Sequence, residues 1–103
     1  MTLKPQKYPP PRVIAVDVDS TLQVGGVANL KLIDWCRARK AGGFTLVLWS
    51  SRGEAHARTV AEKFGVAELF THILSKPGYV VDDQGWGWIK YTRVVSGWGD
   101  PSC

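Results

Sequence analysis

The stretch Val13–Leu22, with the sequence VIAVDVDSTL, decides the expected fold. It opens with four consecutive apolar residues, three of which are β-branched. A continuous apolar run of this kind is typical of a strand that is buried on both faces of a parallel sheet. Asp17 and Asp19 follow where the strand runs out. The first candidate site of the chain therefore lies at a strand end.

Apolar runs and helical stripes alternate along the rest of the chain. Strands are predicted at 44–49, 72–74, 79–81 and 92–95, and helices at 29–41 and 54–64. Gly25 and Gly26 mark the turn of a small hairpin. This alternation favours an α/β fold with a parallel sheet and right-handed crossovers. Ligands of such sheets bind outside the carboxyl ends of the strands.

The two predicted helices have recognisable caps and core faces. Asn29 is suited to cap the first helix, in which Leu30, Ile33 and the stem of Arg37 are expected to line the core. Cys36 is expected to pack inside this helix. The second helix carries an apolar stripe at helical spacing, made of Ala57, Val60, Ala61 and Phe64.

Length and composition predict one folded domain. The 103 residues are 45% hydrophobic and 21% charged, as in ordinary soluble globular proteins. We expect a proline-rich arm at 1–11, the domain at 12–95 and an irregular tail at 96–103. No apolar run approaches the length of a membrane span, so we expect a cytoplasmic protein without a membrane partner. The two cysteines lie 67 positions apart, which indicates neither a zinc site nor a disulfide framework.

The charges are unevenly distributed. The net charge is +4, yet four of the nine acidic residues fall in two short clusters, Asp17 with Asp19 and Asp82 with Asp83. This pattern predicts an acidic pit on a basic body, which would attract an anionic ligand while the pit holds a cation. Charge alone is equally compatible with a soluble domain from a basic proteome.

The second acidic cluster, Asp82 and Asp83, also ends an apolar run. Four carboxylates at one sheet edge would repel one another, and Mg²⁺ (magnesium) is the cation that we expect to compensate them. Ser50 ends the second strand, and Lys76 precedes the acidic pair by six positions. Both side chains are suited to hold phosphoryl oxygens, although in isolation they would be a cap and a surface lysine.

The first cluster, Asp17 with Asp19, has two other interpretations. An Asx-rich turn is a common structural explanation for closely spaced aspartates. A calcium-binding loop of the EF-hand type requires a glycine and a bidentate glutamate at positions that Leu22 and Ala28 occupy here. The calcium interpretation is therefore excluded, and the turn stays open.

Four segments, taken in order, resemble the motifs of the haloacid dehalogenase superfamily of phosphohydrolases. VIAVDVDSTL resembles the first motif, and LVLWSSRG, which contains Ser50, resembles the second. Lys76 in SKPG and the acidic pair in YVVDD match the third and fourth motifs. The resemblance covers about two thirds of the chain. It implies a three-layer Rossmann-like parallel sheet with the first strand central.

The resemblance also implies a role for each matched residue. Asp17 would be the nucleophile that becomes an aspartyl phosphate, and Asp19 would be the general acid and then the general base. Thr21, Ser50 and Lys76 would orient the loop and bind the phosphoryl group. Mg²⁺ would lie between Asp17, the carbonyl of Asp19 and the Asp82–Asp83 pair, in which the direct ligand is left open.

Two departures from the family pattern bear on the substrate. The intervals from Asp17 to Ser50 and from Ser50 to Lys76 are 33 and 26 residues, too short for the usual cap domain. A site without a cap would act on a large phosphorylated substrate, for which a nucleic-acid end is the leading candidate, or would be covered by a second copy in a homo-oligomer. Ser20 also stands where glycine is common.

A catalytically degenerate binding module is the alternative function. In that case the basic body and the aromatic residues Trp86, Trp88, Tyr91 and Trp98 would grip nucleic acid or a protein partner. The structural explanation, which we favour for at least two of the three tryptophans, is that these aromatics cover a sheet edge or are buried in a dimer contact. A dinucleotide-binding protein is disfavoured because no GxGxxG motif follows the first strand.

Overall fold

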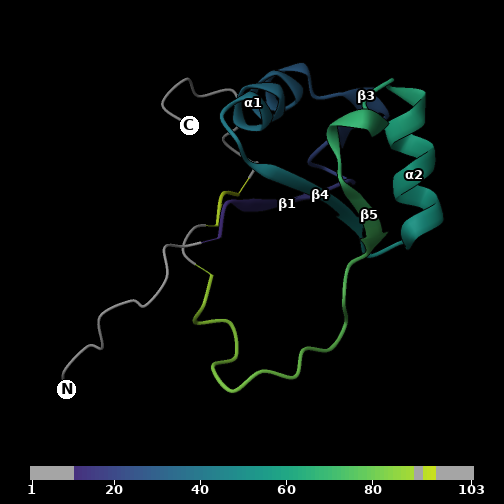
Figure 1. Ribbon diagram of the computed structural model, residues 1–103. Helices are drawn as coiled ribbons and strands as arrows, with labels where there is room; N and C mark the ends of the chain where they lie inside the picture. The colour runs from purple at the N-terminus through teal and green to yellow at the C-terminus, as the bar shows by residue number, and fades with distance from the viewer. Residues whose placement is uncertain (1–10, 90–91, 95–103) are drawn as a thin grey trace.

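The computed structural model describes residues 11–89 and 92–94, and its centre is a parallel sheet of three strands (Figure 1). The strands are β1 (Val13–Asp17), β4 (Thr45–Ser50) and β5 (His72–Ser75), in the order β1-β4-β5. β1 pairs with β4 along its whole length, from Val13 opposite Thr45 to Asp17 opposite Trp49. The predicted α/β class and parallel sheet are confirmed.

The helices and the hairpin lie close to the predicted positions. α1 spans Leu30–Ala41, α2 spans Glu54–Lys63, and a short 3-10 helix, η1, spans Ala67–Leu69. β2 (Gln23–Val24) and β3 (Val27–Ala28) form a small antiparallel hairpin between β1 and α1. None of the helices among the described residues is long and apolar enough to cross a membrane.

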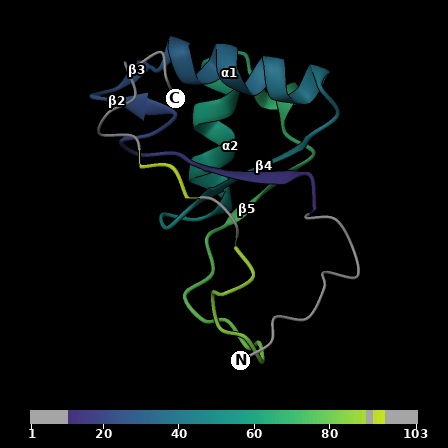
Figure 2. The same cartoon turned by 90° about the vertical axis from the view of Figure 1, so that its left-hand side faces the viewer.

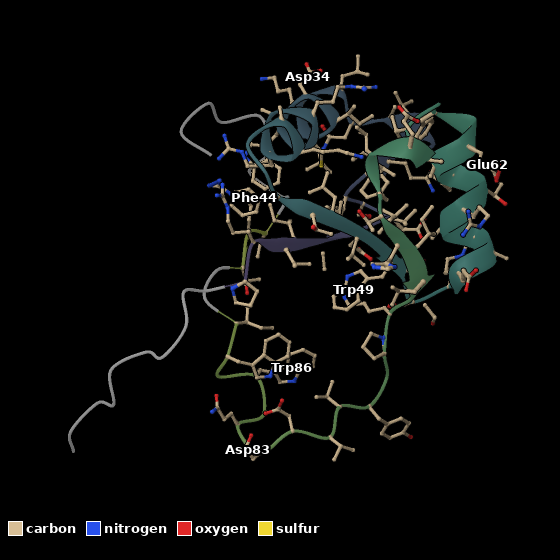
Figure 3. All side chains as sticks on the ribbon, in the orientation of Figure 1. Asp34, Phe44, Trp49, Glu62, Asp83 and Trp86 are labelled. Atoms are coloured by element: carbon tan, nitrogen blue, oxygen red, sulfur yellow. The ribbon has the colours of Figure 1, made fainter. Side chains whose placement is uncertain are left out.

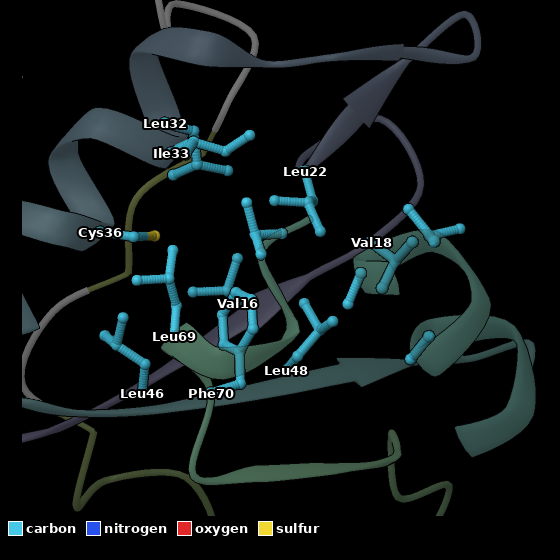
Figure 4. Packing of buried hydrophobic residues seen from close by; sticks show 14 residues of the cluster. Val16, Val18, Leu22, Leu32, Ile33, Cys36, Leu46, Leu48, Leu69 and Phe70 are labelled. Atoms are coloured by element: carbon cyan, nitrogen blue, oxygen red, sulfur yellow. The ribbon is translucent and has the colours of Figure 1, made fainter. Parts of the chain in front are cut away.

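Both helices pack on one side of the sheet (Figure 2). Side chains alternate along β4, so that Leu46 and Leu48 are buried against the helices while Val47 and Trp49 face the other side and are half-buried. Figure 4 shows the core between the helices and the sheet, where Leu46, Leu48 and Val16 meet residues of α1 and η1. Within the described part of the chain, the fold therefore has two layers, the sheet and the helices on one of its faces. The predicted third layer, on the other face, is not seen in the described residues.

The position of β1 differs from the expectation. β4 lies in the centre of the three-stranded sheet, and β1 forms an edge. A central position of β1 requires a further strand on its outer side, and the strand predicted at 79–81 is the candidate for it. No strand forms at 79–81 or at 92–94; position 95 lies outside the described residues.

Chain length explains why the segment 79–81 does not extend the sheet. A parallel strand beyond β1 would lie three strand spacings, about 14 Å, from β5 and would begin about 10 Å back from the carboxyl edge. The distance from Ser75 to Tyr79 would then be about 17 Å, whereas four residue steps reach at most about 14 Å. The connection from Ser75 to Tyr79 is therefore too short to place a strand at 79–81 beyond β1 as long as every residue of β5 stays paired with β4.

The core face of α1 also differs from the expectation. Asn29 caps the helix as predicted, because its side chain accepts a hydrogen bond from the backbone N–H of Leu32. Leu30 is 69% exposed and Arg37 is also exposed, so neither lines the core. The buried face consists of Leu32, Ile33 and Cys36. Burial raises the pKa of the Cys36 thiol to about 11.

The one-sided core predicts unequal costs for truncating neighbouring residues of β4. Leu48→Ala should lower the free energy of unfolding by about 2–5 kcal/mol, since Leu48 is fully buried. Val47→Ala, on the opposite face of the same strand, should cost about 1 kcal/mol or less. Urea unfolding followed by circular dichroism measures both. Equal costs would mean that a further layer covers the second face.

Candidate active site at the carboxyl edge of the sheet

The ends of the three strands bring three of the four predicted motifs to one edge. Asp17 is the last residue of β1, and Ser50 ends β4 opposite Ser75 of β5. Lys76 follows directly, and its backbone N–H donates to the carbonyl of Ser50 over 2.9 Å. Because all three strands run in the same direction, this edge is their shared carboxyl edge.

The loop after β1 is a compact turn. The carbonyl of Val18 accepts hydrogen bonds from the N–H groups of Thr21 and Gln23, and the N–H of Leu22 donates to the carbonyl of Asp17. Ser20 has a φ of 61°, in the left-handed region where a side chain costs about 1–2 kcal/mol. This conformation explains why glycine suits the position, and it keeps Asp19 and Thr21 close to the strand end.

Thr21 connects this loop to the nucleophile candidate and to α1. Its hydroxyl lies 3.4 Å from Oδ2 of Asp17, to which it donates. Its carbonyl accepts a hydrogen bond of 3.1 Å from the side chain of Asn29, the residue that caps α1. The position of the loop is thus coupled to the start of a core helix, in keeping with the orienting role expected for Thr21.

Asp19 is surrounded by donor groups. Gln23 donates to its Oδ1 over 2.8 Å, and Nε2 of His56 lies 3.1 Å from Oδ1 and 3.2 Å from Oδ2. Arg52 is more distant, at 3.7 Å from Oδ1. The hydrogen bond from Gln23, together with His56 and Arg52, lowers the pKa of Asp19 below its ordinary value. The carboxylate form is therefore favoured.

Ser50 forms the turn from β4 into α2. It is 1% exposed, and its Oγ accepts a hydrogen bond of 3.0 Å from the N–H of Arg52. Its carbonyl accepts from the N–H of Gly53, which has a φ of 104° that a side chain would strain. In the described arrangement Ser50 thus has the structural role of a turn residue, and binding of a phosphoryl oxygen remains a proposal.

Asp82 and Asp83 do not join the other acidic residues. They lie on the connection after β5, and Figure 3 shows Asp83 far below Trp49, the residue that pairs with Asp17. Oδ1 of Asp82 accepts a hydrogen bond from the N–H of Gln84. Over residues 11–89 and 92–94, no group of three or more potential ligands could hold a metal ion. The described positions therefore do not fit the expected Mg²⁺ site, because the connection after β5 leads the pair away from β1.

The aromatic residues near the chain end also differ from the expectation. Trp86 and Trp88 are 55% and 44% exposed, and their ring centroids lie 5.7 Å apart. Both rings are therefore more exposed than cover of a sheet edge predicts, and burial in a dimer contact stays a prediction. Tyr91 and Trp98 lie outside the described residues.

Sequence reasoning missed three residues of the site, namely Gln23, Arg52 and His56. Arg52 and His56 belong to the turn after β4 and the first turn of α2, so the βα unit itself brings them to the carboxyl edge. Gln23 opens the hairpin immediately after the loop. Their place after strand ends could have marked them, but the motifs assign no role to Arg52, which lies within LVLWSSRG, and do not include Gln23 or His56.

The donors around Asp19 predict how its pKa responds to substitution. Gln23→Ala should raise the pKa of Asp19 toward its ordinary value of 3.8, because the largest stabilising contact of the carboxylate is lost. Because the pKa of Asp19 is lower in the folded protein than in the unfolded chain, the carboxylate stabilises the fold at pH values above 3.8. This stabilisation is lost as the pH falls through the pKa of the folded state. A carboxyl ¹³C NMR titration measures the shift, with Gln84→Ala as a control on the distant loop. An unchanged pKa in Gln23→Ala would contradict the assignment.

Comparison with known proteins identifies no relative of this chain. No protein-family model matches the chain. No curated protein and no solved structure is significantly similar to it. Function is therefore inferred from the site itself and from the resemblance of its motifs.

Proposed function

We propose that the chain is a phosphohydrolase that works through an aspartyl phosphate on Asp17. The observation that carries the proposal is the gathering of Asp17, Asp19 and Lys76 at the carboxyl edge of one parallel sheet. A nucleophile, a proton carrier and a cation are the three groups that transfer of a phosphoryl group requires. The resemblance of the motifs to the haloacid dehalogenase superfamily supports the same assignment.

In the first half-reaction, a carboxylate oxygen of Asp17 attacks phosphorus. The bond between phosphorus and the leaving oxygen breaks, and that oxygen takes a proton from the carboxylic acid form of Asp19. Lys76 and Ser50 would offset the charge on the phosphoryl oxygens. The products are the free alcohol and an acyl phosphate on Asp17.

In the second half-reaction, Asp19 acts as a base. Its carboxylate accepts a proton from water as the water oxygen attacks phosphorus, the bond to Asp17 breaks, and inorganic phosphate leaves. The lowered pKa of Asp19 suits this step, in which the carboxylate is the base, and opposes the first half-reaction, which needs the carboxylic acid. Both catalytic aspartates then return to their starting forms.

Dependence on Mg²⁺ is part of the proposal, although no step above is routed through a metal. It requires Asp82 and Asp83 to approach Asp17. The segment after Ser75 would have to leave its described path, and its length allows this, since the seven steps from Ser75 to Asp82 reach about 24 Å and β1 lies about 10 Å from β5. A fourth strand beyond β1 would in addition require β5 to release at least its last paired residue.

Substitution of the nucleophile tests the proposed reaction. Asp17→Asn should abolish hydrolysis of p-nitrophenyl phosphate, measured with and without added Mg²⁺, because the amide cannot form the acyl phosphate. Asp34→Asn, an exposed position on α1, is the matched control and should keep full activity. Full activity in Asp17→Asn would reject the proposal.

The proposed substrate class is a phosphorylated nucleic-acid end. The net charge of +4 and the exposed rings of Trp86 and Trp88 support it, since cations hold the backbone and aromatic side chains stack on bases. In the alternative, a binding module, oligonucleotides would bind equally well to wild type and Asp17→Asn without hydrolysis in either.

Kinetics on two substrates test this class. The kcat/KM for a terminally phosphorylated oligonucleotide should exceed that for a mononucleotide and should fall steeply with added salt, as counterion release requires. Trp86→Ala should lower the first value and leave the second unchanged. Equal rates on both substrates, or a flat salt response, would exclude nucleic acid while leaving the hydrolase standing.

A further inference from the structure

His56 makes the longest-range contact with the candidate proton carrier. It lies 37 positions from Asp19 in the sequence, on the first turn of α2. Its Nε2 is within 3.2 Å of both carboxylate oxygens, so a single ring nitrogen is within hydrogen-bond distance of the whole group. The sequence motifs assign His56 no role.

The other two partners of Asp19, Gln23 and Arg52, contact only one of its two carboxylate oxygens. Gln23 donates to Oδ1 alone, and Arg52 lies 3.7 Å from the same oxygen with a side chain that is 66% exposed. Ion pairs of this length and exposure contribute little. Among the described contacts, His56 is thus the one that reaches Oδ2.

His56 also differs from these partners in rigidity. Its side chain is only 20% exposed, and the next residue of the helix, Ala57, is fully buried in the core. Val60, one turn further on, is buried as well. A helix that is packed in this way on the sheet holds its side chains more firmly than a loop does. Gln23, by contrast, belongs to a hairpin of two-residue strands.

We propose that His56 is a positioning residue that holds the carboxyl group of Asp19 in the orientation for proton exchange with the leaving oxygen. The inference rests on the proposed phosphohydrolase function. His56 acts through Asp19 and has no contact of its own with the phosphoryl group in the proposed mechanism. Its removal leaves Gln23 and Arg52 on Oδ1, so that Oδ2 becomes free to turn away from the reacting atoms.

This role predicts a dependence on the leaving group. A p-nitrophenolate departs readily without a proton, whereas an alkoxide such as that of glycerol must be protonated as it leaves. His56→Ala should therefore lower kcat/KM for glycerol phosphate by about tenfold or more. The kcat/KM for p-nitrophenyl phosphate should change less than about threefold, because kcat/KM reports only the steps up to departure of the leaving group and excludes the second half-reaction.

Three further variants make the test specific. His56→Gln places an Nε2 donor the same number of bonds from the backbone and should restore most of the activity on glycerol phosphate. Arg58→Ala removes an exposed cation that pairs with Glu54 on the same helix, and it should behave as wild type. Adding His56→Ala to Asp19→Asn should cause no further loss, because the two residues act as one unit.

The outcomes separate this inference from the function on which it rests. An active wild type in which His56→Ala lowers kcat/KM equally for both substrates, or in which His56→Gln restores nothing, would overturn the positioning role alone. A wild type that hydrolyses neither phosphate would overturn the phosphohydrolase and the positioning role together. Circular dichroism melts of each variant identify losses that arise from unfolding.

Discussion

The parallel pairing of β1 with β4 is the interaction on which the site depends. Its register places Asp17 opposite Trp49, one position before Ser50, at the end of both strands. Pairing of β4 with β5 then brings Lys76 against the carbonyl of Ser50. A shift by one residue would move Leu48 out of the core and Asp17 away from the edge, so burial of the apolar face also specifies the geometry of the site.

The same packing supports the loop that carries Asp19. α1 holds the loop through Asn29, which binds the carbonyl of Thr21 as well as capping the helix. α2 holds it through His56, while the neighbouring Ala57 packs in the core. Two helices that cover one face of the sheet therefore also clamp the first loop at its edge. The strained backbone of Ser20 lies between these two attachments.

Elements with a strong local pattern could be predicted from the sequence, and those that depend on distant parts of the chain could not. The apolar run of β1 and the stripe of α2 identify themselves by periodicity alone. The segment 79–81 has an equally good strand pattern, but a link of three residues cannot bring it beside β1. Likewise, the contact of His56 with Asp19 joins positions 37 residues apart, which no local motif encodes.

The central claim is that Asp17 carries the phosphoryl group during turnover. It is tested most directly by quenching the wild-type protein with acid during hydrolysis of a phosphate ester, reducing the product with borohydride and mapping the peptides by mass spectrometry. Reduction of an aspartyl phosphate leaves homoserine, and the account predicts that residue at position 17 alone. Turnover with homoserine at another aspartate, or at none, would contradict it.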